Sequence, residues 1–162
     1  MSASRIRTKA MLGASVVAAA VAALMAAPAE GAAALARQSM HHGATLKILA
    51  PKKHTNVVGP KVLVQVGVKE LTLVLAGSPL KDGEGHLHFF IDVPATHVKV
   101  GALIPLDSTT RYVHAGKPPF DQREIELAPG KHTITVVAAN SAHLRLAEPK
   151  PVSVTFMVTA PK

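Results

Sequence analysis

Hydrophobic and polar residues alternate with a period of two along several short stretches of the chain. The clearest runs are residues 61–68, 131–139 and 152–158, with shorter ones at residues 45–50, 71–75 and 124–127. This is the period of a strand that packs one face on a core, and turns rich in glycine and proline separate the runs. The pattern predicts an all-β domain over residues 45–160. We expect an immunoglobulin-like Greek-key β-sandwich of about seven strands, and the sequence leaves the order of the strands open.

Residues 85–92 form the predicted strand that carries the most distinctive side chains. One face is apolar, and the other holds His86, His88, Phe90 and Asp92. Residues at i and i+2 of a strand lie about 7 Å apart at the backbone, so both imidazoles can reach one small cation. We expect the histidine face to be open to solvent. The alternative, that the pair only decorates a solvated sheet face, stays open.

The N-terminal region has the pattern of a secretory leader. Arg5, Arg7 and Lys9 precede an uncharged apolar run, and two small-x-small cleavage patterns follow. We therefore predict a signal peptide over residues 1–36, a flexible arm over residues 37–44, and a periplasmic or secreted protein. An uncleaved leader would instead tether the chain to a membrane.

The composition narrows the possible chemistry. The chain has no cysteine, which excludes disulfides and thiolate metal sites. Its formal net charge is +8, but the lysines are scattered and aromatic residues are few, so nucleic-acid binding is not expected. All nine histidines follow the leader. The arm carries Met40, His41 and His42, side chains that can attract copper, and the alternative that the arm is an inert linker stays open.

The remaining histidines lie mostly in loops. Residues 94–122 are interrupted by glycine and proline, with at most short strands near residues 97–100 and 111–113, and a connection of this length is often functional. It contains His97 and His114. We expect His97 and His54 to be exposed and without a partner, whereas His114 can join either of the two groups described next.

Antiparallel pairing of residues 85–92 with residues 131–139 would bring His143 towards His86 and His88. Three imidazoles suit Cu(II) or Zn(II), with affinity falling between pH 7 and 5 as the imidazoles are protonated. The same pairing would bring Asp92 towards His132, whose ring the carboxylate could orient. The alternative for His132 is a packed corner residue that bonds back to the backbone.

Three motifs resemble a family of small exported bacterial domains of unknown function. They are Gly85-His86-x-His88-x-x-x-Asp92, Ile104-Pro105-x-Asp107, and the segment from Leu127 to Thr133 with a later His143. The last third of the chain is also similar, more weakly, to periplasmic copper-resistance proteins of the CopC type. This chain lacks their histidine at the mature N-terminus, so the resemblance implies copper chemistry without their terminal site.

The sequence therefore predicts an exported metal-binding protein, a copper or zinc carrier or buffer. The candidate ligands are His86, His88, His143, His114, His132 and Asp92, and the expected partners are the metal ion and a possible periplasmic protein. The alternative is an immunoglobulin-like structural or interaction module with no metal function. We do not expect an enzyme, because the chain shows no nucleophile elbow, phosphate loop or paired carboxylates; a metal-dependent enzyme ranks last.

Overall fold

The computed structural model describes residues 43–106 and 111–161. The predicted signal peptide and the predicted arm up to residue 42 lie outside the described residues, as does Asp107. No helix in the described ranges is both long and apolar enough to cross a membrane.

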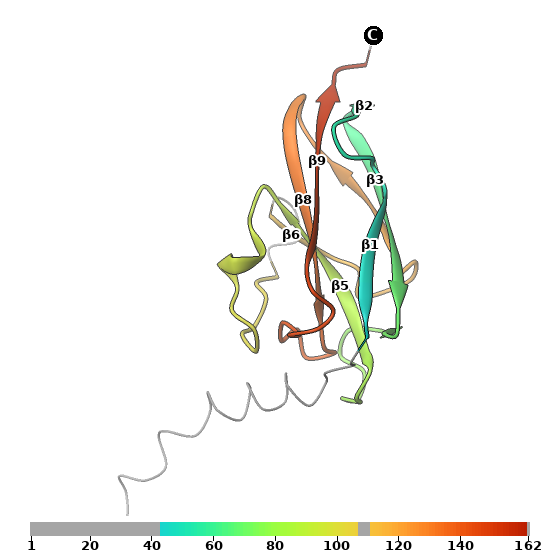
Figure 1. The fold of residues 1–162 in the computed structure, drawn as a ribbon, viewed down its shortest axis with the longest axis vertical. Coiled ribbons are helices and arrows are strands. Elements are labelled where there is room, and N and C mark those ends of the chain that lie inside the picture. Colours follow the sequence, from blue (N-terminus) through green and yellow to red (C-terminus); the bar gives the residue numbers. More distant parts are fainter. Residues whose placement is uncertain (1–42, 107–110, 162) are drawn as a thin grey trace, which may run out of the picture.

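Two sheets pack face to face, and Figure 1 shows them edge-on, with β1 and β3 to the right of the layer that contains β8 and β9. The smaller sheet has the order β1-β3-β7, made of Thr45–Ala50, Lys61–Lys69 and Gln122–Glu126. The larger has the order β2-β9-β8-β5-β4, made of Asn56–Val58, Val152–Thr159, Gly130–Ala139, Glu84–Ile91 and Thr72–Leu73, and β6 (Tyr112–His114) also pairs with β5. This confirms the predicted immunoglobulin-like β-sandwich.

Strand β5 lies inside the larger sheet and pairs antiparallel with β8, as expected from the sequence. The register sets His86 opposite Ala139 and Ile91 opposite Ile134. The start of β5 therefore lies beside the end of β8, where the chain turns into the loop that carries His143. This register determines which histidines can meet.

The main core lies between the sheets. It contains the apolar face of each long strand, including Val64 from β3, Phe89 from β5, Val136 from β8 and Phe156 from β9, all at most 2% exposed. Burial of these faces explains why period two predicted the strands so well.

A second apolar cluster covers the outer face of β5 and β8. It is formed by Phe90, Val137 and Ala139 of these strands and by residues of the following connection, including Ile104 and Tyr112. The rings of Phe90 and Tyr112 meet edge to face, with centroids 4.9 Å apart. In Figure 1 the connection lies on the side of β5 and β8 away from β1 and β3. The expectation of a solvated histidine face was therefore wrong, because this connection folds back over the sheet.

Some short elements also differ from the sequence prediction. The expected strand near residues 97–100 is replaced by a 3-10 helix, η1 (Ala95–His97), and β4 is shorter than the predicted residues 71–75. Strand β2 was not predicted, and it pairs in parallel with β9. Elements of two or three residues depend on tertiary pairing and leave no detectable period in the sequence.

Candidate metal centre

Strand β5 places two imidazoles beneath the surface. His86 and His88 point away from the main core, and each is 0% exposed. Gly85 lets β5 approach β8 at this point, because a Cβ there would collide with the carbonyl oxygen of Ala139. The two rings are therefore held by a closely packed, central part of the sheet.

The loop after β8 supplies the third imidazole. Its conformation is fixed by the buried Asn140, whose Oδ1 accepts hydrogen bonds from the backbone N–H groups of Ala142 and Leu144, both at 3.0 Å. His143 has a positive φ of 62°, a left-handed conformation that turns the chain sharply at this residue. The ring of His143 reaches back over the start of β5, where it contacts His86 and His88.

Three ring nitrogens from these residues converge on one point. The Nε2 atoms of His86 and His88 are 3.0 Å apart, and Nδ1 of His143 lies 3.1 Å from the first and 3.4 Å from the second. A proton on one of these nitrogens can point at only one of the other two. Hydrogen bonding therefore cannot satisfy all three contacts, whereas one cation can accept all three lone pairs.

The separations agree with those of metal ligands. Zinc–imidazole bonds of about 2.0–2.1 Å at tetrahedral angles place two ligand nitrogens about 3.3–3.4 Å apart, and smaller angles bring them closer. The observed 3.0–3.4 Å falls in this range. The three histidines form a group that can hold a metal ion, and their ligand atoms all lie within 4.8 Å of one another.

Burial keeps these imidazoles in the neutral form that binds metals. Desolvation, together with repulsion from His143 and His114, lowers the pKa of His86 to about 3. Desolvation and the neighbouring imidazoles, His86 first, lower the pKa of His88 to about 2. Burial also lowers the pKa of His143. Proton competition at this site therefore begins at lower pH than ordinary imidazoles would give.

Strand β6 brings His114 beside this group, where it sits opposite His88 in the register. Its ring lies 5.8 Å from that of His86 and 5.4 Å from that of His143, centroid to centroid. Burial, then repulsion from His143, Arg123 and Lys117, lowers the pKa of His114. Its ring nitrogens are not part of the three-histidine group.

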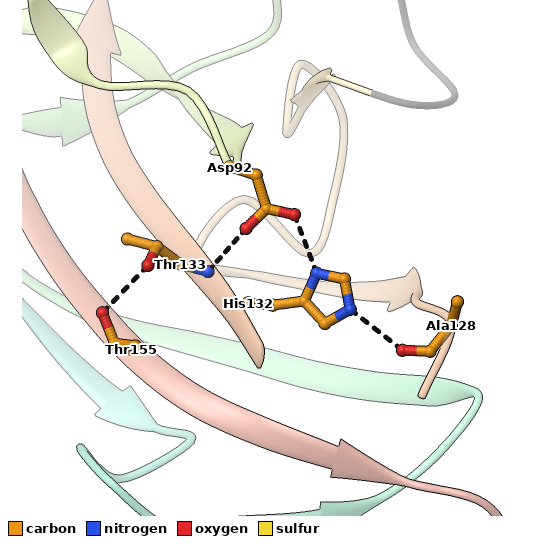
Figure 2. A network of polar contacts seen from close by, with 5 residues as sticks. All are labelled: Asp92, Ala128, His132, Thr133 and Thr155. Atoms are coloured by element: carbon orange, nitrogen blue, oxygen red, sulfur yellow. Dashed lines mark hydrogen bonds and ion pairs between the residues drawn. The ribbon is translucent and has the colours of Figure 1, made fainter. Parts of the chain in front are cut away.

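Asp92 and His132 lie together at the opposite end of β5 and β8 (Figure 2). Oδ2 of Asp92 is 2.8 Å from Nδ1 of His132, and Oδ1 accepts the backbone N–H of Thr133 at 2.7 Å. His132 Nε2 donates to the carbonyl oxygen of Ala128 at 2.9 Å. Both ring nitrogens of His132 thus have oxygen partners at hydrogen-bond distance, so neither is directed at the three-histidine group. His132 is thus both a partner of Asp92 and a corner residue bonded to the backbone, as the two sequence interpretations proposed. The pair of Asp92 and His132 is not part of the three-histidine group.

His54 and His97 are exposed, and neither belongs to the three-histidine group.

The sequence analysis missed two residues that hold the segments of His143 and His114 in place, Asn140 and Arg123. The guanidinium of Arg123 bonds the carbonyl oxygens of His114 at 3.2 Å and Lys117 at 2.7 Å and thereby holds the loop after β6. A single asparagine or arginine in a loop or short strand gives no sequence signal for such roles.

Comparison with known proteins places these residues in a family. Residues 64–159 match the model described as a domain of unknown function, DUF4399. The chain belongs to the DUF4399 family. The matched region of this DUF4399 domain contains β5, β6 and the loop with His143.

Further comparisons add little about function. No curated protein matches the chain. Among solved structures, the chain is similar to a fibronectin(III)-like module of Clostridium thermocellum CbhA, at 16% sequence identity and a TM-score of 0.44. That similarity covers 73% of this chain and 100% of the module. The similarity to CopC-type proteins suggested by the sequence stays a prediction.

Proposed function

We propose that this DUF4399 domain binds one divalent transition-metal ion, copper or zinc, through His86, His88 and His143, and serves as a carrier or buffer. The observation that carries the proposal is the convergence of three ring nitrogens at 3.0–3.4 Å. One proton can bridge only one pair of these nitrogens, so close contacts between lone pairs remain unless a cation lies between them.

The donor set narrows the choice of ion. Imidazole suits Zn(II) and Cu(II), whereas Cu(I) prefers thiolate and thioether sulfur, and the three-histidine group contains no sulfur ligand. We assign the site to binding rather than catalysis because the sequence carries no motif for a nucleophile or an acid–base pair.

We further propose that the domain works outside the cytoplasm, which is supported by the leader pattern of residues 1–36. N-terminal sequencing of the exported protein should find that the mature chain begins between Pro28 and Gln38. Retention of residues 1–27 would contradict the proposal.

The metal site can be tested by calorimetry with Zn(II) and Cu(II) on protein purified without a histidine tag. All proteins compared carry His41→Ala and His42→Ala, so that the histidine pair of the N-terminal region does not contribute to the binding measured. We expect one ion per chain. His143→Ala should weaken binding at least tenfold, because even the loss of a residue that only hydrogen-bonds to a metal ligand lowers metal affinity by about 10–100-fold. His143 lies on a loop, so its loss costs little core packing.

His97→Ala is the matched control, because this exposed histidine lies outside the three-histidine group and should leave the affinity unchanged. Equal affinity of wild type and His143→Ala would reject the site. If the wild type bound neither ion, the alternative of a structural or interaction module would take its place.

A further inference from the structure

The four imidazoles near the start of β5 have a regular arrangement. All six centroid distances among His86, His88, His114 and His143 lie between 4.7 and 5.8 Å. Four points with nearly equal pairwise separations are the corners of a tetrahedron. The fourth ring thus lies over the open side of the three-histidine group.

The size of this tetrahedron fits an ion at its centre. With metal–nitrogen bonds of about 2.0–2.1 Å, each ring centroid lies about 3.2 Å from the ion, so tetrahedral imidazoles have centroids about 5.2 Å apart. The six observed distances bracket this value. The His114 ring is therefore already at the distance of a ligand.

Only the rotation of the His114 ring separates it from that role. Its Nε2 lies against Gly116, 2.5 Å from where a Cβ of that residue would be. The backbone around it is held by two hydrogen bonds. Arg123 Nε donates to the carbonyl oxygen of His114, and the backbone N–H of Ala115 donates to the carbonyl oxygen of Leu87 at 2.8 Å. To act as a ligand, His114 would have to rotate about its side-chain bonds until one ring nitrogen faces the centre of the group, with β6 staying in place.

We propose that His114 is the fourth ligand and that the ion lies in a closed, tetrahedral site of four neutral imidazoles. This inference rests on the proposed metal-binding function and makes it more specific. A tetrahedral nitrogen site suits Zn(II), whereas Cu(II) prefers tetragonal geometry, so the site selects zinc over copper. A closed site has no open position for a substrate, which is typical of binding rather than catalysis.

The arrangement also indicates how the ion enters. His86 and His88 are fully buried on the central strand, while His114 and His143 are partly exposed and lie on separate surface segments. An ion would therefore approach from the side of His114 and His143, and the buried pair His86 and His88 would hold it on the side of the sheet.

The test uses Co(II) in the full-length protein, since tetrahedral Co(II) absorbs visible light much more strongly than five- or six-coordinate Co(II). The wild type should give an intense tetrahedral spectrum that added azide does not change. In His114→Ala the position should open, so azide should alter the spectrum and Zn(II) affinity should fall tenfold or more. His97→Ala should behave as wild type.

The outcomes separate this inference from the function on which it rests. If azide alters the wild-type spectrum, or if His114→Ala keeps the wild-type spectrum and affinity, the three-histidine site stands and the fourth ligand is rejected. If the wild type binds neither Co(II) nor Zn(II), the proposed function itself fails. The azide experiment on the wild type decides the point even if His114→Ala does not fold.

Discussion

At the residue scale, burial of the imidazoles changes how the proposed metal site should respond to acid. Three imidazoles with an ordinary pKa of about 6.5 would lose roughly 30-fold in affinity between pH 7 and 6. The pKa values of about 3 for His86 and about 2 for His88 remove these two residues from the competition in this range.

We therefore expect Zn(II) affinity to fall by less than tenfold between pH 7 and 6. The remaining dependence would come from His143 and His114, whose pKa values burial also lowers. Competition with a chelator of known pH dependence measures the affinity. A loss of 30-fold or more would show that the histidines titrate as if exposed.

The sequence could predict which histidines meet, but not that two of them are buried. Period two placed His86 and His88 opposite the apolar face of β5, and antiparallel pairing with β8 led to His143. Phe90 shares their face, and a large apolar side chain there was the available sign of a second cover. The contacts that position His143 and His114 could not be predicted, because they join Asn140 and Arg123 to backbone groups made adjacent only by the fold.

At the scale of elements, Asp92 joins the end of β5 to the start of β8 (Figure 2). Asp92→Ala removes the partners of His132 Nδ1 and of the Thr133 N–H, and it places alanine at a positive φ of 56°. We expect a loss of about 1–3 kcal/mol in the free energy of unfolding.

Asp92→Asn is the matched variant, because it keeps an oxygen for Thr133 and tolerates the positive φ, so its loss should be smaller. Urea denaturation would measure both changes. Metal affinity should be unaffected, since this pair lies at the other end of the strands. A large loss of affinity in folded Asp92→Asn would show that the two groups of residues are coupled.

The long strands could be predicted because each packs a regular apolar face on the core, whereas the connection between β5 and β6 could not. Its prolines and glycines suggested a functional loop, and the structure shows it as a cover whose apolar residues, including Ile104, pack on Phe90. Such contacts are irregular in sequence and follow no period.

At the scale of the whole molecule, the buried imidazoles should make the metal-free fold sensitive to acid. A histidine whose folded pKa lies below its unfolded value of about 6.5 leaves stability intact above that pH and reduces it below, because the unfolded chain binds the extra proton. The sensitive window runs from about pH 6.5 down to about 3 for His86 and down to about 2 for His88.

We expect the free energy of unfolding to fall by about 2–4 kcal/mol between pH 7 and 5, with a limit of about 1.4 kcal/mol per pH unit for each buried imidazole. Urea denaturation at pH 7, 6 and 5 would measure this. A folded His86→Gln/His88→Gln variant should lose most of the slope, and His97→Ala should keep it. Unchanged wild-type stability at pH 5 would contradict the predicted protonation states.

The two faces of β5 have one further consequence, for when the ion can be loaded. Leu87 and Phe89 on one face of the strand pack in the core, and His86 and His88 on the other face belong to the proposed site. The third proposed ligand, His143, lies 57 residues after His86 in the sequence. An unfolded chain offers the adjacent pair but not the complete set of ligands. A free ion concentration of 100 times Kd would then stabilise the folded state by about 2.7 kcal/mol. In an exported chain, loading would wait until folding is complete, so the ion would come from the compartment in which the protein folds.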